Sequence, residues 1–215
     1  MLSPADYEAW YHTPRGRWIG AVELRLVRQL LCATPGASVL DVGCGSGYFS
    51  RGLHAGGYQV TGLDPDATML AYARAQNVNV EYLRGSALTL PFPDRCFDYT
   101  VAITSLCFIE PPQLALREML RVSRYGVVLG LLNRHSVLHR RKYGRGAYVG
   151  ARWDSPENVR HWWHATAPQT QLRLRSAVFL PGGGWVARVV EQVLPQRLLC
   201  GGFLAAHIRT VPTVR

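Results

Sequence analysis

Val39-Leu40-Asp41-Val42-Gly43-Cys44-Gly45-Ser46-Gly47-Tyr48 is the stretch that decides the fold of this chain. An apolar run leads into an acidic residue, and three glycines follow at alternate positions. Because glycine has no Cβ, it accepts positive φ angles and lets a ligand lie against the main chain. A strand, such a loop and a following helix form the usual cradle for a nucleotide-like ligand in an α/β sheet.

The spacing of the glycines narrows the class of ligand. A dinucleotide site reads G-x-G-x-x-G, and its third glycine would fall at position 48, where this chain has Tyr48. A nucleotide phosphate loop needs a Lys-Ser/Thr pair, which the stretch lacks. The pattern D-x-G-x-G-x-G instead resembles the first motif of class I S-adenosylmethionine (SAM)-dependent methyltransferases.

Length and composition fit one globular domain. The chain has 215 residues, of which 48% are hydrophobic, and this composition argues against wholesale disorder. The longest apolar run, residues 127–132, is far shorter than the ~20 residues of a membrane-spanning helix. Residues 1–6 carry neither the basic start nor the apolar core of a secretion signal. We therefore expect a single domain over residues 1–215 and a cytoplasmic location.

The cysteines give no sign of a disulfide framework or of a metal site. They are scattered, form no C-x-x-C pair and lie near no histidine at metal-ligand spacing. We expect reduced, mostly buried thiols and no bound metal. Cys44, inside the glycine loop, is expected to fill space there.

The positive charge is unevenly distributed. The formal net charge is +10, and almost all of it comes from arginine because Lys142 is the only lysine. Between Glu118 and Asp154 the sequence has no acidic residue and eight basic ones. Such a block attracts an anionic substrate, a nucleic acid or a membrane surface.

Apolar periodicity predicts strands that alternate with helices. Seven segments are expected as strands, namely residues 39–41, 58–63, 78–83, 97–103, 125–132, 172–180 and 202–209. Helices are expected within the first forty residues and at residues 49–55, 67–76, 113–122, 156–166 and 186–193. This alternation indicates a doubly wound, mainly parallel seven-stranded sheet with helices on both faces and right-handed crossovers.

The chain divides into three expected regions. The α/β core covers residues 36–133, and a helical cap over residues 1–35 precedes it. Regularity fails after Asn133, where a basic, glycine-containing stretch with interspersed aromatic residues begins. We expect residues 134–170 to form a lid over the substrate, inserted before the last strands.

Ligands of open α/β sheets bind beyond the carboxyl ends of the strands. At the first strand end the three glycines would support the methionine part of SAM, and Asp41 would orient the loop or the amino group. Asp64 follows the second strand, 17 residues past Gly47. A carboxylate there can accept two hydrogen bonds from a ribose diol, although a helix N-cap in a turn is the alternative role.

Residues 90–98 extend the resemblance over most of the predicted core. They read L-P-F-P-D-x-x-F-D, which is similar to a motif of the broad methyltransferase family that includes ubiquinone and menaquinone methyltransferases. In that family an acid after the third strand contacts the adenine amino group, whereas this chain has Ser86 at that place. The resemblance implies a Rossmann-like fold and SAM as the cofactor. The cofactor-binding residues it implies are Asp41, Gly43, Cys44, Gly45, Gly47, Asp64, Pro65, Ser86, Ala87 and Thr104.

The end of the fourth strand narrows the acceptor. Residues 104–108 read Thr-Ser-Leu-Cys-Phe, without the Pro-Pro-aromatic motif of exocyclic-amine methyltransferases, the Pro-Cys of cytosine-5 enzymes or the carboxylates of a catechol metal site. Metal-free, in-line methyl transfer to a small molecule is the remaining expectation. The residues expected to contact that substrate are Tyr11, Asn133, Tyr143 and Trp162.

No residue is assigned as a catalytic base. Five histidines are candidates without a distinguishing context, namely His12, His135, His139, His161 and His164.

Two functions other than small-molecule methyl transfer remain open. The basic segment 134–152 allows an RNA methyltransferase, with nucleic acid as a less favoured partner than a small molecule. A catalytically silent SAM-binding or scaffold protein is the other.

Overall fold

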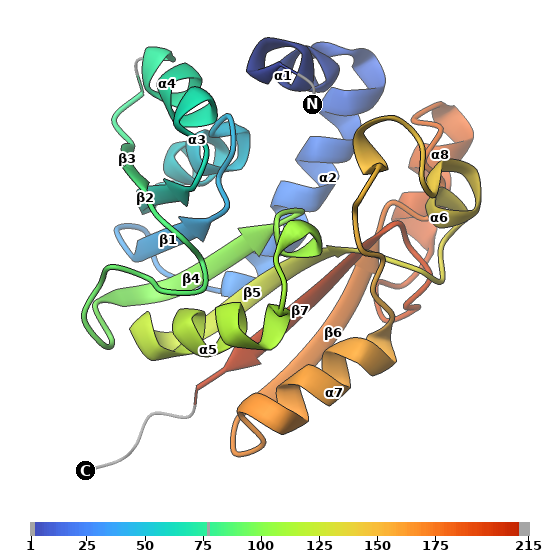
Figure 1. The fold of residues 1–215 in the computed structure, drawn as a ribbon. Coiled ribbons are helices and arrows are strands. Elements are labelled where there is room, and N and C mark those ends of the chain that lie inside the picture. Colours follow the sequence, from blue (N-terminus) through green and yellow to red (C-terminus); the bar gives the residue numbers. More distant parts are fainter. Residues whose placement is uncertain (1–2, 77, 211–215) are drawn as a thin grey trace.

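The computed structural model describes residues 3–76 and 78–210, which build on one seven-stranded sheet (Figure 1). The strand order is β3-β2-β1-β4-β5-β7-β6, and only β7 runs antiparallel to its neighbours. The strands are β1 (Ser38–Val42), β2 (Gln59–Asp64), β3 (Glu81–Arg84), β4 (Phe97–Ile103), β5 (Ser123–Leu132), β6 (Gln171–Ala177) and β7 (Phe203–Arg209). The expected doubly wound, mainly parallel sheet is confirmed.

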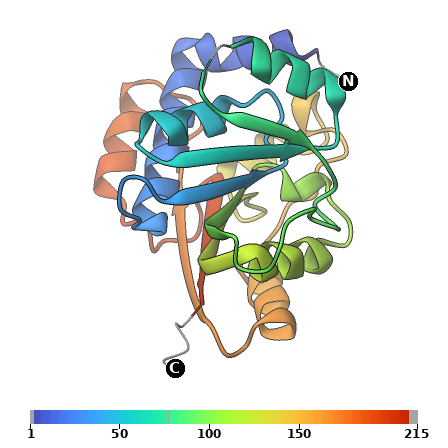
Figure 2. The same ribbon diagram turned by 90° about the vertical axis from the view of Figure 1, so that its left-hand side faces the viewer.

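Helices cover both faces of the sheet, and the view of Figure 2 separates the two layers. α2, α3 and α8 lie on one side of the sheet, whereas α5 and α7 lie on the other. The α-helices are α1 (Pro4–His12), α2 (Pro14–Leu31), α3 (Tyr48–Ala55), α4 (Ala67–Ala75), α5 (Pro112–Val122), α6 (Val137–Lys142), α7 (Pro156–Thr166) and α8 (Trp185–Val193). Two short 3-10 helices are η1 (Leu106–Phe108) and η2 (Gly146–Tyr148).

Alternation along β1 shows how this layering arises from the sequence. Val39 joins the apolar cluster under α2 and α3, whereas Leu40 and Val42 join the cluster under α5 and α7. Successive side chains of a strand point to opposite faces, so a strand covered on both sides must be apolar throughout. Asp41 is the polar exception, and it points toward α3.

The N-terminal cap consists of two helices joined by a sharp corner. Thr13 caps α2 by accepting a hydrogen bond from the Gly16 amide (3.0 Å), and Pro14 follows it at the first helical position. A Cβ on Gly16 would lie 1.9 Å from the carbonyl oxygen of Trp10. The close approach of α1 to α2 therefore requires glycine here, and it turns α1 over the end of the sheet.

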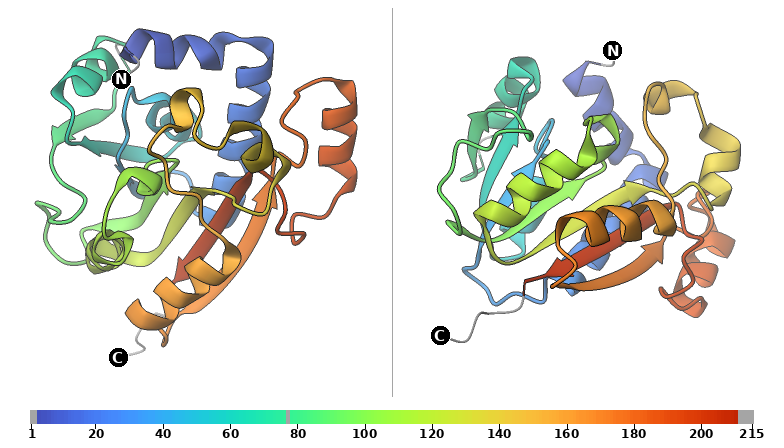
Figure 3. Two further views of the ribbon diagram at one scale, coloured as in Figure 1. Left: turned by 45° about the vertical axis from the view of Figure 1, so that its right-hand side comes forward. Right: turned by 60° about the horizontal axis from the view of Figure 1, so that its bottom comes forward.

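The region expected to form a lid, residues 134–170, divides into two parts that lie in different places. Residues 134–155 pass along the carboxyl ends of the strands, but α7 packs on the face of the sheet against α5, β6 and β7 (Figure 3, right). Val159 and Trp162 of α7 are buried there because they continue the apolar cluster under α5. The second half of the predicted lid is thus a crossover helix of the core.

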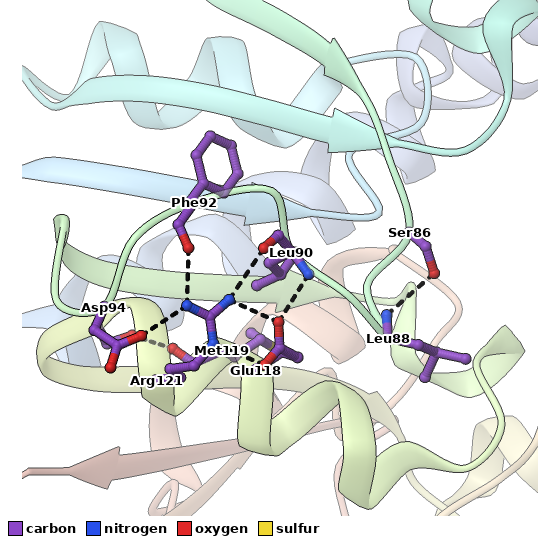
Figure 4. Close-up of polar contacts among 9 residues, drawn as sticks. Ser86, Leu88, Leu90, Phe92, Asp94, Glu118, Met119 and Arg121 are labelled. Atoms are coloured by element: carbon purple, nitrogen blue, oxygen red, sulfur yellow. Dashed lines mark hydrogen bonds and ion pairs between the residues drawn. The ribbon is translucent and has the colours of Figure 1, made fainter.

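The loop that precedes β4 is attached to α5 through Arg121 (Figure 4). The Arg121 guanidinium donates to the carbonyl oxygens of Leu90 (3.0 Å) and Phe92 (2.8 Å). It also pairs with Glu118, whose carboxylate accepts from the Leu90 amide, and this arginine lowers the pKa of the Glu118 carboxyl. Part of the residue 90–98 motif therefore serves to close the loop against α5.

Asp98 completes that motif with a second structural contact. Its carboxylate accepts hydrogen bonds from the amide (2.9 Å) and the hydroxyl (3.0 Å) of Ser38, the first residue of β1. The Arg124 guanidinium pairs with the other carboxylate oxygen at 3.2 Å. Asp98 thus aligns the beginnings of β1 and β4, far from the ends where ligands bind.

Among the described residues, no helix has both the length and the apolarity needed to cross a membrane.

We expect Arg121→Ala to lower the free energy of unfolding by about 1–2 kcal/mol, because several charge-assisted hydrogen bonds are lost at a site that water can partly reach. Urea unfolding measures this change. Arg117→Ala is the matched control, since Arg117 lies on the same helix and is exposed. Equal stability of the two variants would contradict a role for Arg121 in fixing the loop.

Candidate functional site

Two cavities meet at the carboxyl ends of the strands. One has a volume of about 280 Å³ and lies over the glycine loop, and the other has about 360 Å³ and lies beneath α1. Tyr7, Thr104 and Phe108 line both of them. Figure 3 shows the stretch between α6 and α7 beside the N-terminal helices at this edge of the sheet. The end of β4 is therefore the junction of the two spaces.

The glycine loop forms the floor of the smaller cavity. Gly43, Gly45 and Gly47 all have positive φ angles, of 74°, 53° and 79°. A Cβ on Gly43 would lie 2.4 Å from the Cβ of Ser105, whereas a Cβ on Gly45 would stand in open space. Gly45 therefore presents bare backbone to the cavity, as a cradle for a ligand requires.

Asp64 joins the end of β2 to that loop. One of its carboxylate oxygens accepts from the Gly45 amide (2.8 Å), and the other accepts from the Asp66 amide (2.9 Å). Asp66 in turn caps α4 by accepting from the amides of Thr68 and Met69. Asp64 lines the smaller cavity, and its partial burial raises the pKa of the carboxyl. The N-cap role that the sequence left open belongs to Asp66.

Asp41 is a buried carboxyl at the back of the smaller cavity. Its one hydrogen-bond donor among the described residues is the hydroxyl of Ser50 (2.6 Å). Burial raises the pKa of Asp41 to about 7, while the Ser50 hydrogen bond opposes this shift and the negative charge of Asp64 adds to it. Burial thus brings the pKa of Asp41 close to neutral pH.

A buried ion pair fixes α1 to the glycine loop. The carboxylate of Glu8 accepts from the hydroxyl of Ser46 (2.5 Å) and pairs with the Arg51 guanidinium. Arg51 also donates to the Ser46 carbonyl oxygen (2.8 Å). Removal of one partner would leave a buried charge without compensation, so the three residues act as one junction. The N-terminal cap and the loop are thereby attached to each other.

Aromatic rings separate the two cavities. Tyr11 stacks on Tyr48 with ring centroids 3.8 Å apart, and Tyr11 lines the larger cavity while Tyr48 lines the smaller one. The hydroxyls of Tyr7 and Tyr11 lie 3.4 Å apart. Burial raises the pKa of both groups, so these phenols are neutral hydrogen-bonding groups at physiological pH. The aromatic side chains of α1 thus face the cavities.

One face of α2 supplies the inner wall of the larger cavity. Arg15, Ile19 and Glu23 follow one another at four-residue spacing and all three line the cavity. Glu23 is buried, and burial raises the pKa of its carboxyl to about 8. The sequence analysis missed Glu23 because it fell within an apolar helical repeat. An acid among the buried positions of an amphipathic helix was the available signal.

The basic segment has two different environments. Lys142 and Arg145 line the larger cavity. Arg152 instead donates to the carbonyl oxygens of Leu106 (2.9 Å) and Ile109 (3.0 Å) and pairs with Asp154. Its charge is thus used to hold the turn that follows β4. The remaining arginines of the segment, namely Arg134, Arg140 and Arg141, are exposed.

Most of the predicted cofactor residues come together around the smaller cavity. Those that line it are Asp41, Gly43, Cys44, Gly45, Asp64, Pro65 and Thr104. Gly47 lies just outside as the N-cap of α3. Ser86 and Ala87 do not line the cavity, and the Ser86 hydroxyl instead accepts from the Leu88 amide (3.2 Å). Lining residues that the sequence analysis did not name include Met69, Ile103 and Ser105.

The predicted substrate residues are mostly dispersed. Tyr11 lines the larger cavity, and Tyr143 lines an open hollow that adjoins it beside Gly144. Asn133 and Trp162, the other two, line neither of the two cavities. Asn133 is fully buried, and its amide nitrogen donates to the carbonyl oxygens of residues 199 (3.0 Å) and 201 (2.7 Å). Trp162 belongs to the apolar core, with the Arg152 guanidinium 5.1 Å from its ring centroid.

The candidate histidine bases lie away from the site. The residues that line the two cavities include none of His12, His135, His139, His161 and His164. Cys44 and Cys107 line the cavities, but burial raises the pKa of both groups and keeps them as thiols. Within residues 3–76 and 78–210 no three His, Cys, Asp or Glu side chains converge as a metal site. The chemistry of the site must come from other groups.

The smaller cavity fits a cationic nucleoside cofactor. Gly45 leaves its backbone open to the ligand, and Asp41 and Asp64 bring two carboxyls to the same space. Carboxylates accept hydrogen bonds from a ribose diol and favour a positive charge. Gly43, Gly45 and Asp64 would hold such a ligand.

Comparisons with known proteins agree with this geometry. Residues 40–130 match the family described as the methyltransferase domain. The malonyl-(acyl-carrier protein) O-methyltransferase of Pectobacterium atrosepticum is 41% identical over 100 residues, which are 46% of this chain and 40% of that relative. The demethylmenaquinone methyltransferase of Renibacterium salmoninarum is 36% identical over 102 residues, or 47% of this chain and 43% of that relative.

A solved structure extends the likeness over the whole fold. It is a SAM-dependent methyltransferase from Thermotoga maritima, described as a possible histamine N-methyltransferase, with a TM-score of 0.75 and 23% identity over 96% of each chain. At this identity the likeness concerns the fold. The matched region of this chain spans less than half the length of the two curated relatives.

We expect the free energy of unfolding of Asp41→Asn to increase, relative to that of the unchanged chain, as pH rises from 5 to 8. The folded-state pKa of Asp41 is raised to about 7, above the ~3.9 of an unfolded chain. Its stabilising contribution is therefore complete below the unfolded pKa and is lost as pH rises through about 7. Urea unfolding of both proteins at pH 5 and pH 8 measures the difference. A difference that does not change with pH would contradict the raised pKa.

Proposed function

We propose, on the premise that the chain belongs to the class I SAM-dependent methyltransferases, that it transfers a methyl group to a small-molecule acceptor in the larger cavity. SAM is the cofactor of this class and suits the smaller cavity. When bound, it supplies a sulfonium methyl group that is already strongly electrophilic. The protein then has to bind, align and exclude water, since alignment alone accounts for much of the acceleration.

The junction of the two cavities carries the proposal. Thr104 lies at the end of β4 with a left-handed backbone (φ 52°), which is uncommon for a residue other than glycine. Its amide donates to the Gly130 carbonyl oxygen (2.8 Å), so the neighbouring strand supports this strained turn. Thr104 lines both cavities, and a methyl group that leaves one ligand for the other would pass beside it.

The size and lining of the larger cavity support a small acceptor. Its volume of about 360 Å³ lies within the usual range of small-molecule pockets. Apolar and aromatic side chains dominate its walls, and Tyr7, Trp10 and Tyr11 close it from the side of α1. The names of the two relatives mention different acceptors, a malonyl group on a carrier protein and demethylmenaquinone. The relatives therefore support the class of reaction and leave the acceptor to be found.

The function is tested by methyl-labelled SAM with a panel of phenols, quinol precursors, amines and carboxylates. We expect label in at least one acceptor without added metal, because displacement by an aligned nucleophile needs no metal ion. Calorimetric titration with SAM and S-adenosylhomocysteine precedes the panel. Failure of both ligands to bind at millimolar concentration would contradict the proposal, whereas binding without any transfer would favour a silent SAM-binding protein.

An RNA acceptor is the second candidate, favoured by the three exposed arginines Arg134, Arg140 and Arg141. Binding through phosphates weakens steeply as salt concentration rises. Filter binding of RNA between 50 mM and 200 mM salt tests it. Tight, strongly salt-dependent association together with label in RNA would replace the small-molecule proposal.

Asp64→Ala is expected to weaken SAM binding by about tenfold or more. The ribose would lose charge-assisted hydrogen bonds, and the Gly45 amide would lose its hydrogen-bond acceptor. Calorimetric titration measures the dissociation constant. Glu81→Ala is the matched control, since Glu81 is an exposed acid on the adjacent strand β3. Unchanged affinity of Asp64→Ala for SAM would contradict its role in cofactor binding.

A further inference from the structure

Glu23 is a buried acid that no other residue neutralises. Its side chain lines the larger cavity, and the residue is 9% exposed. Within residues 3–76 and 78–210 it forms no hydrogen bond and no ion pair. A carboxyl removed from water without a partner is costly, so such groups concentrate at functional sites. A function in the larger cavity would account for an unpaired carboxyl at this position.

The titratable groups that share the cavity with Glu23, or that its charge reaches, come from several elements. They are Tyr7, Tyr11 and Asp6 of α1, Arg15 of α2, Tyr48 of α3, Cys107 of η1, and Lys142, Arg145 and Tyr148 of the segment after β5. Tyr7, Tyr11, Tyr48 and Tyr148 are all close enough for the charge of Glu23 to raise their pKa values. Four phenols therefore lie within reach of the charge of Glu23, whereas none of the described cations forms an ion pair with it.

The wall of the larger cavity carries charged groups of both signs. Arg15 and Glu23 lie on the same face of α2 with Ile19 between them. Eight residues of helix correspond to about 12 Å along the axis. Lys142 and Arg145 add two further cations to the lining, and the side-chain nitrogen Nε of Arg15 is buried without a hydrogen-bond partner. An elongated ligand can thus place an anionic group near Arg15 and another polar group near Glu23.

We propose that the larger cavity binds an aromatic hydroxyl compound carrying an acidic group, and that Glu23 accepts the proton of the hydroxyl during methyl transfer. This inference rests on the proposed function of the chain. Aromatic walls favour a ring, the three cations of the lining favour an acidic group, and Glu23 favours a group with a proton to lose. An amine cation fits less well, because Arg15, Lys142 and Arg145 would repel it.

The step is balanced without a further reactant. The hydroxyl oxygen forms a bond to the methyl carbon, and the carbon–sulfur bond breaks with its electron pair on sulfur. The hydroxyl proton passes to the carboxylate of Glu23. The products are the methyl ether, S-adenosylhomocysteine and a neutral Glu23, which returns its proton to solvent. The pKa of Glu23, about 8, lies close to the value that suits a base at neutral pH.

The first experiment measures binding of three probes to the protein saturated with S-adenosylhomocysteine. The probes are 4-hydroxycinnamate, cinnamate, which lacks the hydroxyl, and 4-vinylphenol, which lacks the carboxylate. We expect the unchanged chain to prefer 4-hydroxycinnamate over either analogue by about tenfold. Glu23→Gln should abolish the preference for the hydroxyl and Arg15→Gln the preference for the carboxylate. Glu157→Gln, which removes an exposed acid on α7, should keep both preferences.

The second experiment follows methyl transfer to 4-hydroxycinnamate as a function of pH. With Glu23 as the base, kcat should rise as pH rises through about 8, because only the ionised carboxyl accepts a proton. Glu23→Gln should lower kcat by about 100-fold or more and remove this rise. Glu23→Asp should restore part of the rate, and Glu157→Gln should leave it unchanged. Circular dichroism shows that each variant is folded.

The outcomes separate this inference from the function on which it rests. If the unchanged chain binds neither SAM nor S-adenosylhomocysteine, the proposed function fails. If it binds SAM but none of the three probes at 1 mM, the acceptor class is overturned. An unaltered hydroxyl preference in Glu23→Gln overturns the role of Glu23. If Glu23→Gln does not fold, the pH dependence of the unchanged chain and of Glu23→Asp decides, and a rate that does not rise through pH 8 overturns the role.

Discussion

The hydrogen bond between the Gly45 amide and the carboxylate of Asp64 is the interaction on which the site depends. It joins the loop after β1 to the end of β2, and the amides of Gly43 (2.7 Å) and Cys44 (3.1 Å) reinforce it by donating to the Leu63 carbonyl oxygen. A loop with three positive φ angles has no regular hydrogen-bonding pattern of its own. The neighbouring strand therefore supplies its acceptors, and the loop leaves its other face open to the cofactor cavity.

The larger cavity, proposed for the acceptor, is built from different structural elements. The smaller cavity uses backbone and carboxyls at strand ends, whereas the larger cavity is built mainly from side chains of elements outside the sheet. The aromatic rings of α1, one face of α2 and the segment that follows β5 meet only because the corner at Gly16 turns α1 back over the strands. Such walls can change without disturbing the sheet, and the acceptor is accordingly the part of the function that the fold leaves open.

Strand ends were predictable because parallel strands finish at one edge and bring residues distant in sequence together. Asp64 and the glycine loop could be placed in this way. Asn133 also follows a strand, but its side-chain amide donates hydrogen bonds to two carbonyl oxygens more than sixty residues later in the chain. No local sequence pattern reveals these contacts. Trp162 and Glu23 show a limit of predictions from helical periodicity. Periodicity identifies the inward face of a helix, but not whether that face meets a packed core, as for Trp162, or a cavity, as for Glu23.

The buried contact of Glu8 with Ser46 and Arg51 gives the two cavities a shared anchor. A displacement of α1 that admitted a ligand to the larger cavity would also deprive the glycine loop of a partner. Thermodynamic reciprocity then requires that a ligand which secures the loop also favours the closed position of α1. Occupancy of either cavity is thereby linked to occupancy of the other.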